Sequence, residues 1–361
     1  MLEQSQGVEE VRVQYDGEGS DISSCAITEA NEKKDCQVRR EVPTLFCDKA
    51  CLSSALSYTP PPPPPPPPAQ VNIIATADME EPVYLYYELS NFYQNHRRYV
   101  KSLSFKQLQG FIGEEYTADC TPLEKVANPD DPDGDKLLLS PCGLIANSLF
   151  NDVISLDESS ELTMSEDGIA WDSDVEEKFV QPDGFQFNTC TSEAECCQKT
   201  EDENGVSVKW CGKSHQPYTD ASGQLWEYYY PFDDSTQYLY ESYPEVVSPI
   251  EGVKNEHFIV WMRTAGLPTF RKLYGVIDKD VKKGDVLTFN VQANFDVSRF
   301  KGTKSLVIST TSWFGGKNDF LGYSYIVVGV LCLLLGGIFA VKHMVNPRKL
   351  GDTRYLVWKE A

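Results

Sequence analysis

Strand-like pieces recur along the 361-residue chain between turn signals. They lie at residues 83–87, 207–210, 225–230, 257–262, 286–292 and 305–309. Residues 89–99 instead have a pattern that is compatible with a helix. This spacing suits an antiparallel β-sandwich better than alternating βαβ units. We therefore expect a mainly β fold with some α structure, in which residues 71–319 form a β-sandwich ectodomain.

One segment is apolar throughout. Residues 320–341, FLGYSYIVVGVLCLLLGGIFAV, carry no charged side chain, and as a helix they would measure about 33 Å, enough to cross a hydrocarbon core of about 30 Å. Residues 342–361 carry five basic and two acidic side chains, whereas only Lys317 is basic in the fifteen residues before the span. The positive-inside rule therefore predicts a cytosolic tail and an extracytoplasmic ectodomain.

Residues 1–70 form a polar, acidic segment with four cysteines and an unbroken proline run, Pro60–Pro68. Nine prolines favour a polyproline II rod of roughly 28 Å, which we interpret as a spacer or surface loop. The first seventeen residues have no apolar stretch typical of a signal peptide or membrane helix. We expect that a first membrane helix is missing before residue 1; the alternative is a tail-anchored protein with its bulk in the cytosol.

The formal net charge of −22 argues against nucleic-acid binding, because no cluster of lysine and arginine is available for a phosphate backbone. The chain has four histidines and none of the motifs G-x-S-x-G, G-x-G-x-x-G, H-E-x-x-H or a P-loop. We therefore expect no enzyme activity, no catalytic residues and no cofactor.

The eleven cysteines favour a disulfide framework and an oxidising compartment. Ten precede residue 212, and Cys332 lies in the apolar run. Zinc at Cys190, Cys196, Cys197, Cys211 and His215 is the alternative, but paired C-x-x-C knuckles are absent. The acidic loop at residues 128–135 superficially suggests calcium, although its glycine does not fit an EF-hand. We expect no metal site.

Four stretches of the chain are distinctive: YELSNFYQNHRRYVKS at Tyr87–Ser102, PCGLIANSLFND at Pro141–Asp152 with GIAW at Gly168–Trp171 behind it, HFIVWMRTAGLPTFRKLY at His257–Tyr274, and STTSWFGGKNDFLG at Ser309–Gly322. They resemble the cell division control protein 50/ligand-effect modulator family, the β-subunits of type-IV P-type ATPases. They occur in the family's order, and the resemblance covers about residues 8 to 345.

The resemblance implies two membrane helices flanking a glycosylated, disulfide-bonded β-sandwich ectodomain. Members of the family form a heterodimer with the flippase α-subunit in a phospholipid membrane. They allow the α-subunit to leave the endoplasmic reticulum for the Golgi, endosomes or plasma membrane, and they support phospholipid transport, while the ATP-driven chemistry belongs to the α-subunit. We therefore expect a non-catalytic accessory subunit with a lumenal or extracellular ectodomain.

The family pattern also implies specific disulfides. Cys25–Cys51 would enclose Cys36–Cys47, and Cys120 would pair with Cys142. Cys190, Cys196, Cys197 and Cys211 look like an insertion, and because adjacent cysteines rarely bridge each other, two pairings stay plausible. The chain departs from the family in having no N-x-S/T sequon, although Asn151 and Asn290 stand where the family often has one.

Two sets of residues are candidates for partner binding. Gly322, Gly329 and Gly336 recur every seven residues and share a helix face that would allow close packing; ordinary glycine enrichment in membrane helices is the alternative. The basic residues of two family-like stretches could pair with acidic loops of the ATPase or with internal carboxylates. They are His96, Arg97, Arg98 and Lys101 in one, and Arg263 and Arg271 in the other.

Three other functions fit parts of the sequence. A single-pass receptor or adhesion ectodomain would act without an ATPase. A membrane-tethered hydrolase would have an activity that one substitution abolishes. A truncated, inactive relative would explain the missing first helix.

Overall fold

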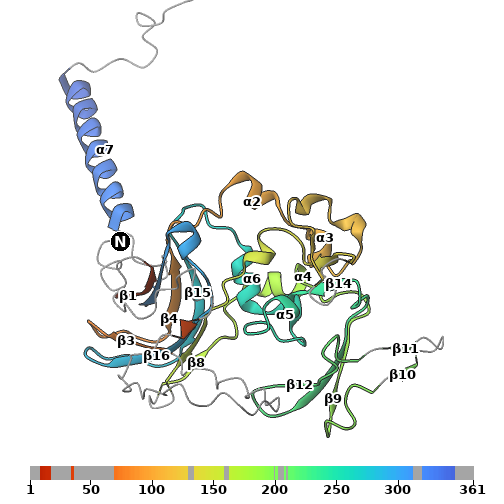
Figure 1. Ribbon diagram of the computed structural model, residues 1–361. Helices are drawn as coiled ribbons and strands as arrows, with labels where there is room; N and C mark the ends of the chain where they lie inside the picture. Colours follow the sequence, from red (N-terminus) through yellow and green to blue (C-terminus); the bar gives the residue numbers. More distant parts are fainter. Residues whose placement is uncertain are drawn as a thin grey trace, which may run out of the picture. The chain divides into compact units, whose positions relative to one another are not determined.

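A computed structural model describes residues 9–17, 34–35, 69–128, 134–157, 162–198, 200–201, 207–208, 210–311 and 319–345 (Figure 1). The chain divides into two compact units, one of residues 10–309 and one of residues 1–9 with 310–361. The cysteines at 25, 36, 47 and 51, the proline run, most of the acidic loop at 128–135 and the predicted cytosolic tail beyond residue 345 lie outside the described residues.

Two antiparallel sheets form the main body of residues 10–309. The first has five strands in the order β1 (Glu10–Gly17), β17 (Thr303–Ser309), β4 (Val83–Leu89), β15 (Phe270–Ile277) and β8 (Met164–Ser165). In the second, β16 (Val286–Ala293) pairs with β2 (Lys34–Asp35), β3 (Ala69–Ile74) and β7 (Val153–Leu156).

The two sheets bury their facing side chains in one hydrophobic core. Leu85 of β4 and Ile308 of β17 come from the first sheet, Ile73 of β3 and Phe289 of β16 from the second, and all four are fully buried in the same cluster. Each such side chain contributes about 1.5–3 kcal/mol by leaving water. The prediction of a mainly β, antiparallel fold is confirmed.

Short helices and smaller sheets complete this unit. The helices are α2 (Arg97–Lys101), α3 (Phe105–Leu108), α4 (Asp172–Glu177), α5 (Leu239–Ser242) and α6 (Glu256–Met262), with 3₁₀ turns η1 (Glu114–Tyr116), η2 (Ala118–Cys120), η3 (Ala146–Ser148), η4 (Gly252–Lys254) and η5 (Ser298–Phe300). The smaller sheets are β14 (Thr236–Tyr238) with β6 (Leu137–Ser140) and β5 (Lys125–Val126), β12 (Tyr218–Thr219) with β13 (Leu225–Tyr229) and β9 (Gln186–Cys190), and β10 (Thr200–Glu201) with β11 (Ser207–Val208). Figure 1 shows α2 to α6 gathered beside the two sheets.

Most strand predictions are confirmed, but two element predictions are wrong. Residues 257–262 form helix α6 rather than a strand, because Asn255 Oδ1 accepts a hydrogen bond from Phe258 N at 3.0 Å and caps the first turn. Residues 89–99 are not one helix, since β4 continues to Leu89 and Asn91 has a φ of 58°. Helix α2 begins only after His96.

Strand β1 belongs to residues 1–70, the segment described above as polar and acidic. A buried ion cluster joins it to β17. Lys304 Nζ of β17 lies 3.0 Å from Asp16 Oδ2 of β1 and 2.8 Å from Asp152 Oδ2, and all three side chains are at most 1% exposed. The Tyr15 hydroxyl donates a 2.7 Å hydrogen bond to Asp152 Oδ2. Burial raises the pKa of Tyr15 well above its ordinary value, so this hydroxyl keeps its proton.

The second unit contains helix α7 (Asp319–Val345). Its residues Gly322–Val345 are long and apolar enough to cross a membrane, judged by length and composition, and none of the most apolar window is buried within the protein. The predicted apolar helix is therefore present, and it continues four residues beyond the predicted end at 341.

Candidate partner-binding surface

Two loops that are far apart in the sequence lie side by side next to α2. Phe92 N donates to Pro268 O at 3.0 Å, Ala265 N donates to Gln94 Oε1 at 2.8 Å, and Asn95 Nδ2 donates to Gly266 O at 2.9 Å. Three of the four family-like stretches therefore meet here, because the loops belong to Tyr87–Ser102 and His257–Tyr274, and Trp171 ends the GIAW piece beside Arg263.

Helix α2 places its basic side chains in solvent. Tyr99 anchors it, since the ring is 9% exposed and packs edge-on against Phe92, while the hydroxyl lies 2.8 Å from Ser148 Oγ. The side chains of Arg97, Arg98 and Lys101 are exposed, and the structure contains no ion pair for any of them within the described ranges. In a chain with a net charge of −22, three exposed cations within five residues are a local exception.

Large apolar side chains stand exposed beside these cations. Tyr93 is 56% exposed, Leu267 is 69% exposed and Val100 is 39% exposed. We call these three residues, together with Arg97, Arg98 and Lys101, the α2 surface. Aromatic residues and arginine are the side chains most enriched at the centres of protein interfaces, where they fill pockets and pair with carboxylates.

Arg263 has a different role from the α2 cations. Its Nε and Nη2 lie 2.7 and 2.6 Å from Asp174 Oδ2 of α4, and its guanidinium stacks 4.7 Å above the ring of Trp171. Lys178 also contacts this carboxylate at 2.6 Å. Burial alone would raise the pKa of Asp174, but the hydrogen bonds from Lys178 and Arg263 outweigh it and hold that pKa below its ordinary value.

Arg271 is likewise engaged within the protein. Its two terminal nitrogens bind Glu10 of β1 at 2.7 and 2.8 Å, and its Nε binds Glu88 of β4 at 2.7 Å. Arg12 of β1 contacts the other oxygen of Glu88 at 2.7 Å. Of the candidate ectodomain arginines, the structure therefore places Arg263 and Arg271 in internal ion pairs and leaves Arg97 and Arg98 outside them.

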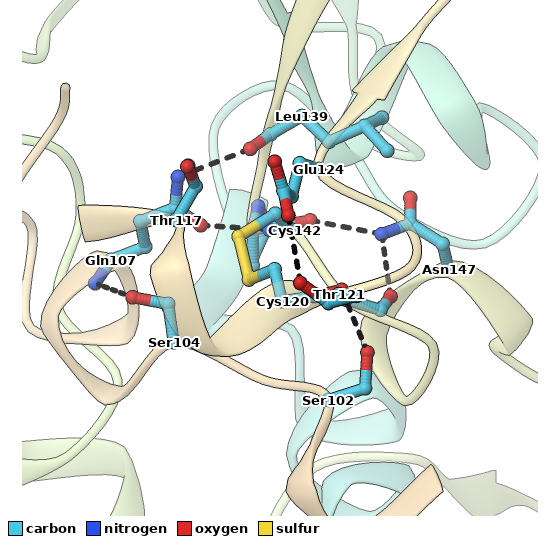
Figure 2. Close-up of a disulfide and its surroundings, with 12 residues drawn as sticks. Ser102, Ser104, Gln107, Thr117, Cys120, Thr121, Glu124, Leu139, Cys142 and Asn147 are labelled. Atoms are coloured by element: carbon cyan, nitrogen blue, oxygen red, sulfur yellow. Dashed lines mark hydrogen bonds between the residues drawn. A yellow bond between two sulfur atoms is a disulfide. The ribbon is translucent and has the colours of Figure 1, made fainter. Parts of the chain in front are cut away.

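The Cys120–Cys142 disulfide lies next to the end of α2 and to α3 (Figure 2). It is the pairing that the family resemblance implies. Both cysteines are fully buried. Ser102, which ends α2, donates from Oγ to Cys120 O at 2.8 Å, and Gln107 of α3 accepts from Cys142 N at 2.7 Å. The disulfide and its hydrogen bonds therefore fix the base of the α2 surface.

The backbone beside this disulfide requires a glycine. Gly143 has a φ of +100°, and a Cβ there would collide with the carbonyl oxygen of Ser102. The backbone at Gly143 can therefore pack closely against the end of α2, where Leu144 N donates to Ser102 Oγ at 2.9 Å.

The comparison with protein families decides what kind of chain this is. The family model of the LEM3 (ligand-effect modulator 3) family/CDC50 family matches residues 1–349. This chain belongs to that family.

Curated relatives agree with this assignment. ALA-interacting subunit 3 of Arabidopsis thaliana is 40% identical over 287 residues, which are 78% of this chain and 66% of the relative. Cell cycle control protein 50A of Rattus norvegicus is 36% identical over 279 residues, covering 73% of this chain and 72% of the relative. The phospholipid-transporting ATPase accessory subunit CDC50 of Chaetomium thermophilum is 31% identical over 284 residues, covering 78% and 62%. The chain thus spans about two thirds of the length of these relatives.

In this CDC50-family chain, the insertion-like cysteines adopt one of the two pairings that the sequence left open. Cys190 bridges Cys196, and Cys197 bridges Cys211. Both disulfides lie at the β9–β13 sheet, where Cys190 is the partner of Leu225.

Three glycines of α7 recur along one face of this helix. A Cβ added at Gly329 or Gly336 would meet no atom within 4 Å. Gly322 falls in the same series at a spacing of seven residues. At these three positions no side chain keeps the backbone of a neighbouring helix at a distance.

Two features of the candidate site were not visible to sequence reasoning. Tyr93 and Leu267 belong to the family-like stretches, but nothing in their local pattern distinguishes them from core residues. Lys272 donates from Nζ to the carbonyls of Val260, Trp261 and Arg263 and so closes the end of α6, while burial lowers its pKa to about 8. A lysine inside a strand gave no signal for this capping role.

Proposed function

We propose that this CDC50-family chain is the non-catalytic accessory subunit of a type-IV P-type ATPase that transports phospholipids. It supports folding of the ATPase, its exit from the endoplasmic reticulum and lipid translocation, while the α-subunit performs the chemistry. The names of the relatives support this proposal, since they describe ALA-interacting subunits and an accessory subunit of a phospholipid-transporting ATPase. The ectodomain faces the lumen of the endoplasmic reticulum, Golgi or endosomes, or the cell exterior.

The α2 surface is the docking site for the ATPase in this proposal. The observation that carries it is that Arg97, Arg98 and Lys101 have no ion pair among the described residues and stand beside exposed Tyr93 and Leu267. Acidic extracytoplasmic loops of the ATPase would neutralise the cations, and burying the apolar side chains would add affinity. Helix α7 supplies the second contact, in which a membrane helix of the ATPase packs along Gly322, Gly329 and Gly336.

A glycan placed on the surface tests the docking site in cells. Arg97→Thr creates the sequon Asn95-His96-Thr on the α2 surface, and the added glycan should prevent the ATPase from co-purifying with a C-terminally tagged chain. Arg97→Ala removes the same charge without a glycan and should reduce recovery only several-fold. Gln292→Thr creates a sequon at Asn290, on the outer face of β16, and should leave recovery unchanged.

Endoglycosidase shifts establish that both sequons are occupied. Full recovery of the ATPase with a glycan on Asn95 would rule out the α2 surface as the docking site. Absence of any P-type ATPase from the unmodified complex, analysed by mass spectrometry, would instead favour a receptor or adhesion ectodomain and contradict the accessory-subunit function itself.

A further inference from the structure

Strand β9 is an edge strand that is exposed on both of its faces. It forms one side of the sheet of β12, β13 and β9, and Figure 1 shows β9 and β12 apart from the two main sheets. Successive side chains of a strand point to opposite faces, yet Gln186, Phe187, Asn188 and Thr189 are all exposed. A strand that packed one face on the protein would alternate between buried and exposed positions. The described part of the chain therefore covers neither face of β9.

The outer edge of β9 carries backbone groups that can bind another strand. β9 pairs with β13 in one continuous antiparallel register, from Gln186 opposite Tyr229 to Cys190 opposite Leu225. In such a pair, alternate residues direct their N–H and C=O groups toward the neighbour, and the residues between them direct these groups away. Within the described part of the chain, residues 186–189 make no backbone hydrogen bond outside this pairing. The edge therefore offers donors and acceptors to an extended chain.

β9 lacks the features that protect the edge strand β1 from further pairing. β1 carries the charged residues Glu10, Arg12 and Asp16, and its register shifts between Gln14 and Asp16. Charged side chains and irregularities of this kind discourage an additional strand. Residues 184–192 instead contain neither a charged residue nor a proline. In a chain with a net charge of −22, an exposed and uncharged strand edge is typical of a surface that pairs with another strand.

The uncharged run is centred on Asn188, and this symmetry indicates which strand fits. The run extends equally far to both sides of Asn188, from residue 184 to residue 192. An antiparallel pairing of two copies centred on Asn188 therefore sets uncharged residues opposite uncharged residues along the whole run. It also sets Phe187, which is 47% exposed, opposite Thr189 of the other copy. Pairs of an aromatic and a β-branched side chain stabilise neighbouring antiparallel strands.

We propose that β9 is the interface between two copies of this chain. The two β9 strands pair antiparallel about a two-fold axis at Asn188, so that the small sheets of the two copies become one continuous sheet. The pairing uses no residue of the α2 surface, and each copy keeps its proposed docking site for the ATPase. Asp183 and Glu193, which flank the uncharged run, and the net charge of each copy oppose the association. Added salt screens this repulsion and should therefore strengthen the dimer.

Co-isolation of two differently tagged full chains from the same membranes in mild detergent tests this proposal. The unmodified copies should co-purify. Asn188→Lys in both copies places like charges opposite each other at the axis and should lower recovery of the second copy about tenfold. Thr219→Lys is the matched control, because Thr219 is an exposed residue of β12, at the opposite edge of the same sheet, and it should leave recovery unchanged. Thermal unfolding midpoints establish that both variants are folded.

Cross-linking identifies the neighbour of β9 directly. Asn188→Cys should give a disulfide between two copies at residue 188, located by mass spectrometry of the linked peptides, whereas Thr219→Cys should give none. Unmodified copies that do not co-purify, or equal recovery with Asn188→Lys and Thr219→Lys, would overturn the proposal. A cross-link from residue 188 to a different protein would assign the edge to that protein and equally overturn it. Asn188→Lys should leave recovery of the ATPase unchanged, so loss of the dimer is distinguishable from loss of the accessory-subunit function.

Discussion

Arg271 of β15 and Glu10 of β1 form a bidentate ion pair with N···O distances of 2.7 and 2.8 Å, although β17 and β4 lie between these two strands in the sheet. The same guanidinium binds Glu88, which is only 8% exposed. Arg271 therefore joins the edge strand β1 to β4 and β15 across the outer face of the sheet.

Removing this arginine should destabilise the unit of residues 10–309. Arg271→Ala leaves Glu88 with Arg12 as its one remaining cation, and we expect a loss of about 1–2 kcal/mol after allowing for the partial exposure of the pair. Thermal unfolding of the full chain in detergent measures the effect. Arg12→Ala is the matched control and should cost less than half as much, because Arg12 makes one contact to the same carboxylate; an equal or larger cost would contradict this ranking.

Breaking the Cys120–Cys142 disulfide should affect partner binding as well as stability. The double variant Cys120→Ser, Cys142→Ser frees the base of α2 and α3, and we expect a loss of about 2–4 kcal/mol together with lower recovery of the ATPase. Cys190→Ser, Cys196→Ser opens a disulfide at the β9–β13 sheet and should leave ATPase recovery per folded chain unchanged. Similar losses of recovery in both variants would show that the effect is general instability.

Acid should weaken the contact between α4 and the end of α6. The pKa of Asp174 is lower in the folded chain than in the unfolded one, so its contribution to stability is present above pH 4, near the unfolded pKa, and is lost as the pH falls through the lower folded pKa. Asp174→Asn lacks this contribution at every pH. The difference in unfolding midpoint between the two proteins should therefore shrink between pH 4 and pH 2, and a constant difference would contradict the assignment.

A bulky residue on the glycine face of α7 should interfere with membrane packing. Gly329→Leu adds a large side chain to the glycine face, and we expect co-purification of the ATPase to fall about tenfold, whereas Leu331→Ala, on the opposite face of α7, should have little effect. Unchanged recovery of the ATPase with Gly329→Leu would exclude the glycine face from the interface.

The hydrophobic pattern of the sequence was enough to predict several strands. In β4, β13, β16 and β17, side chains alternate or are buried in short runs, the patterns that indicate strands. Their predicted bounds agree with the observed ones within two residues at each end. The run at residues 257–262 is too short for its apolar pattern to distinguish strand from helix, and the cap from Asn255 decides for the helix.

The family-like stretches pointed to the candidate surface. The sequence could not show which of their basic side chains are exposed and which form internal ion pairs. Arg97 and Arg263 look equivalent in a linear reading, because both follow an aromatic-rich piece of their stretch. The difference lies in Asp174, which is 89 residues from Arg263 and reaches it only through the packing of α4 against α6. Long-range ion pairs of this kind leave no local signal.

The pairing of β1 with β17 constrains the order of events during synthesis. Glu10 is the partner of Ser309, and Lys304 of β17 neutralises Asp16 of β1, so the first strand has no hydrogen-bonded neighbour in its sheet until the last strand has emerged from the ribosome. Until then β1 and the edge of β4 are unpaired strand edges, which favour wrong association. Closure of the five-stranded sheet is therefore a late step in synthesis, and a nascent chain that stops before residue 303 should be a substrate for chaperones.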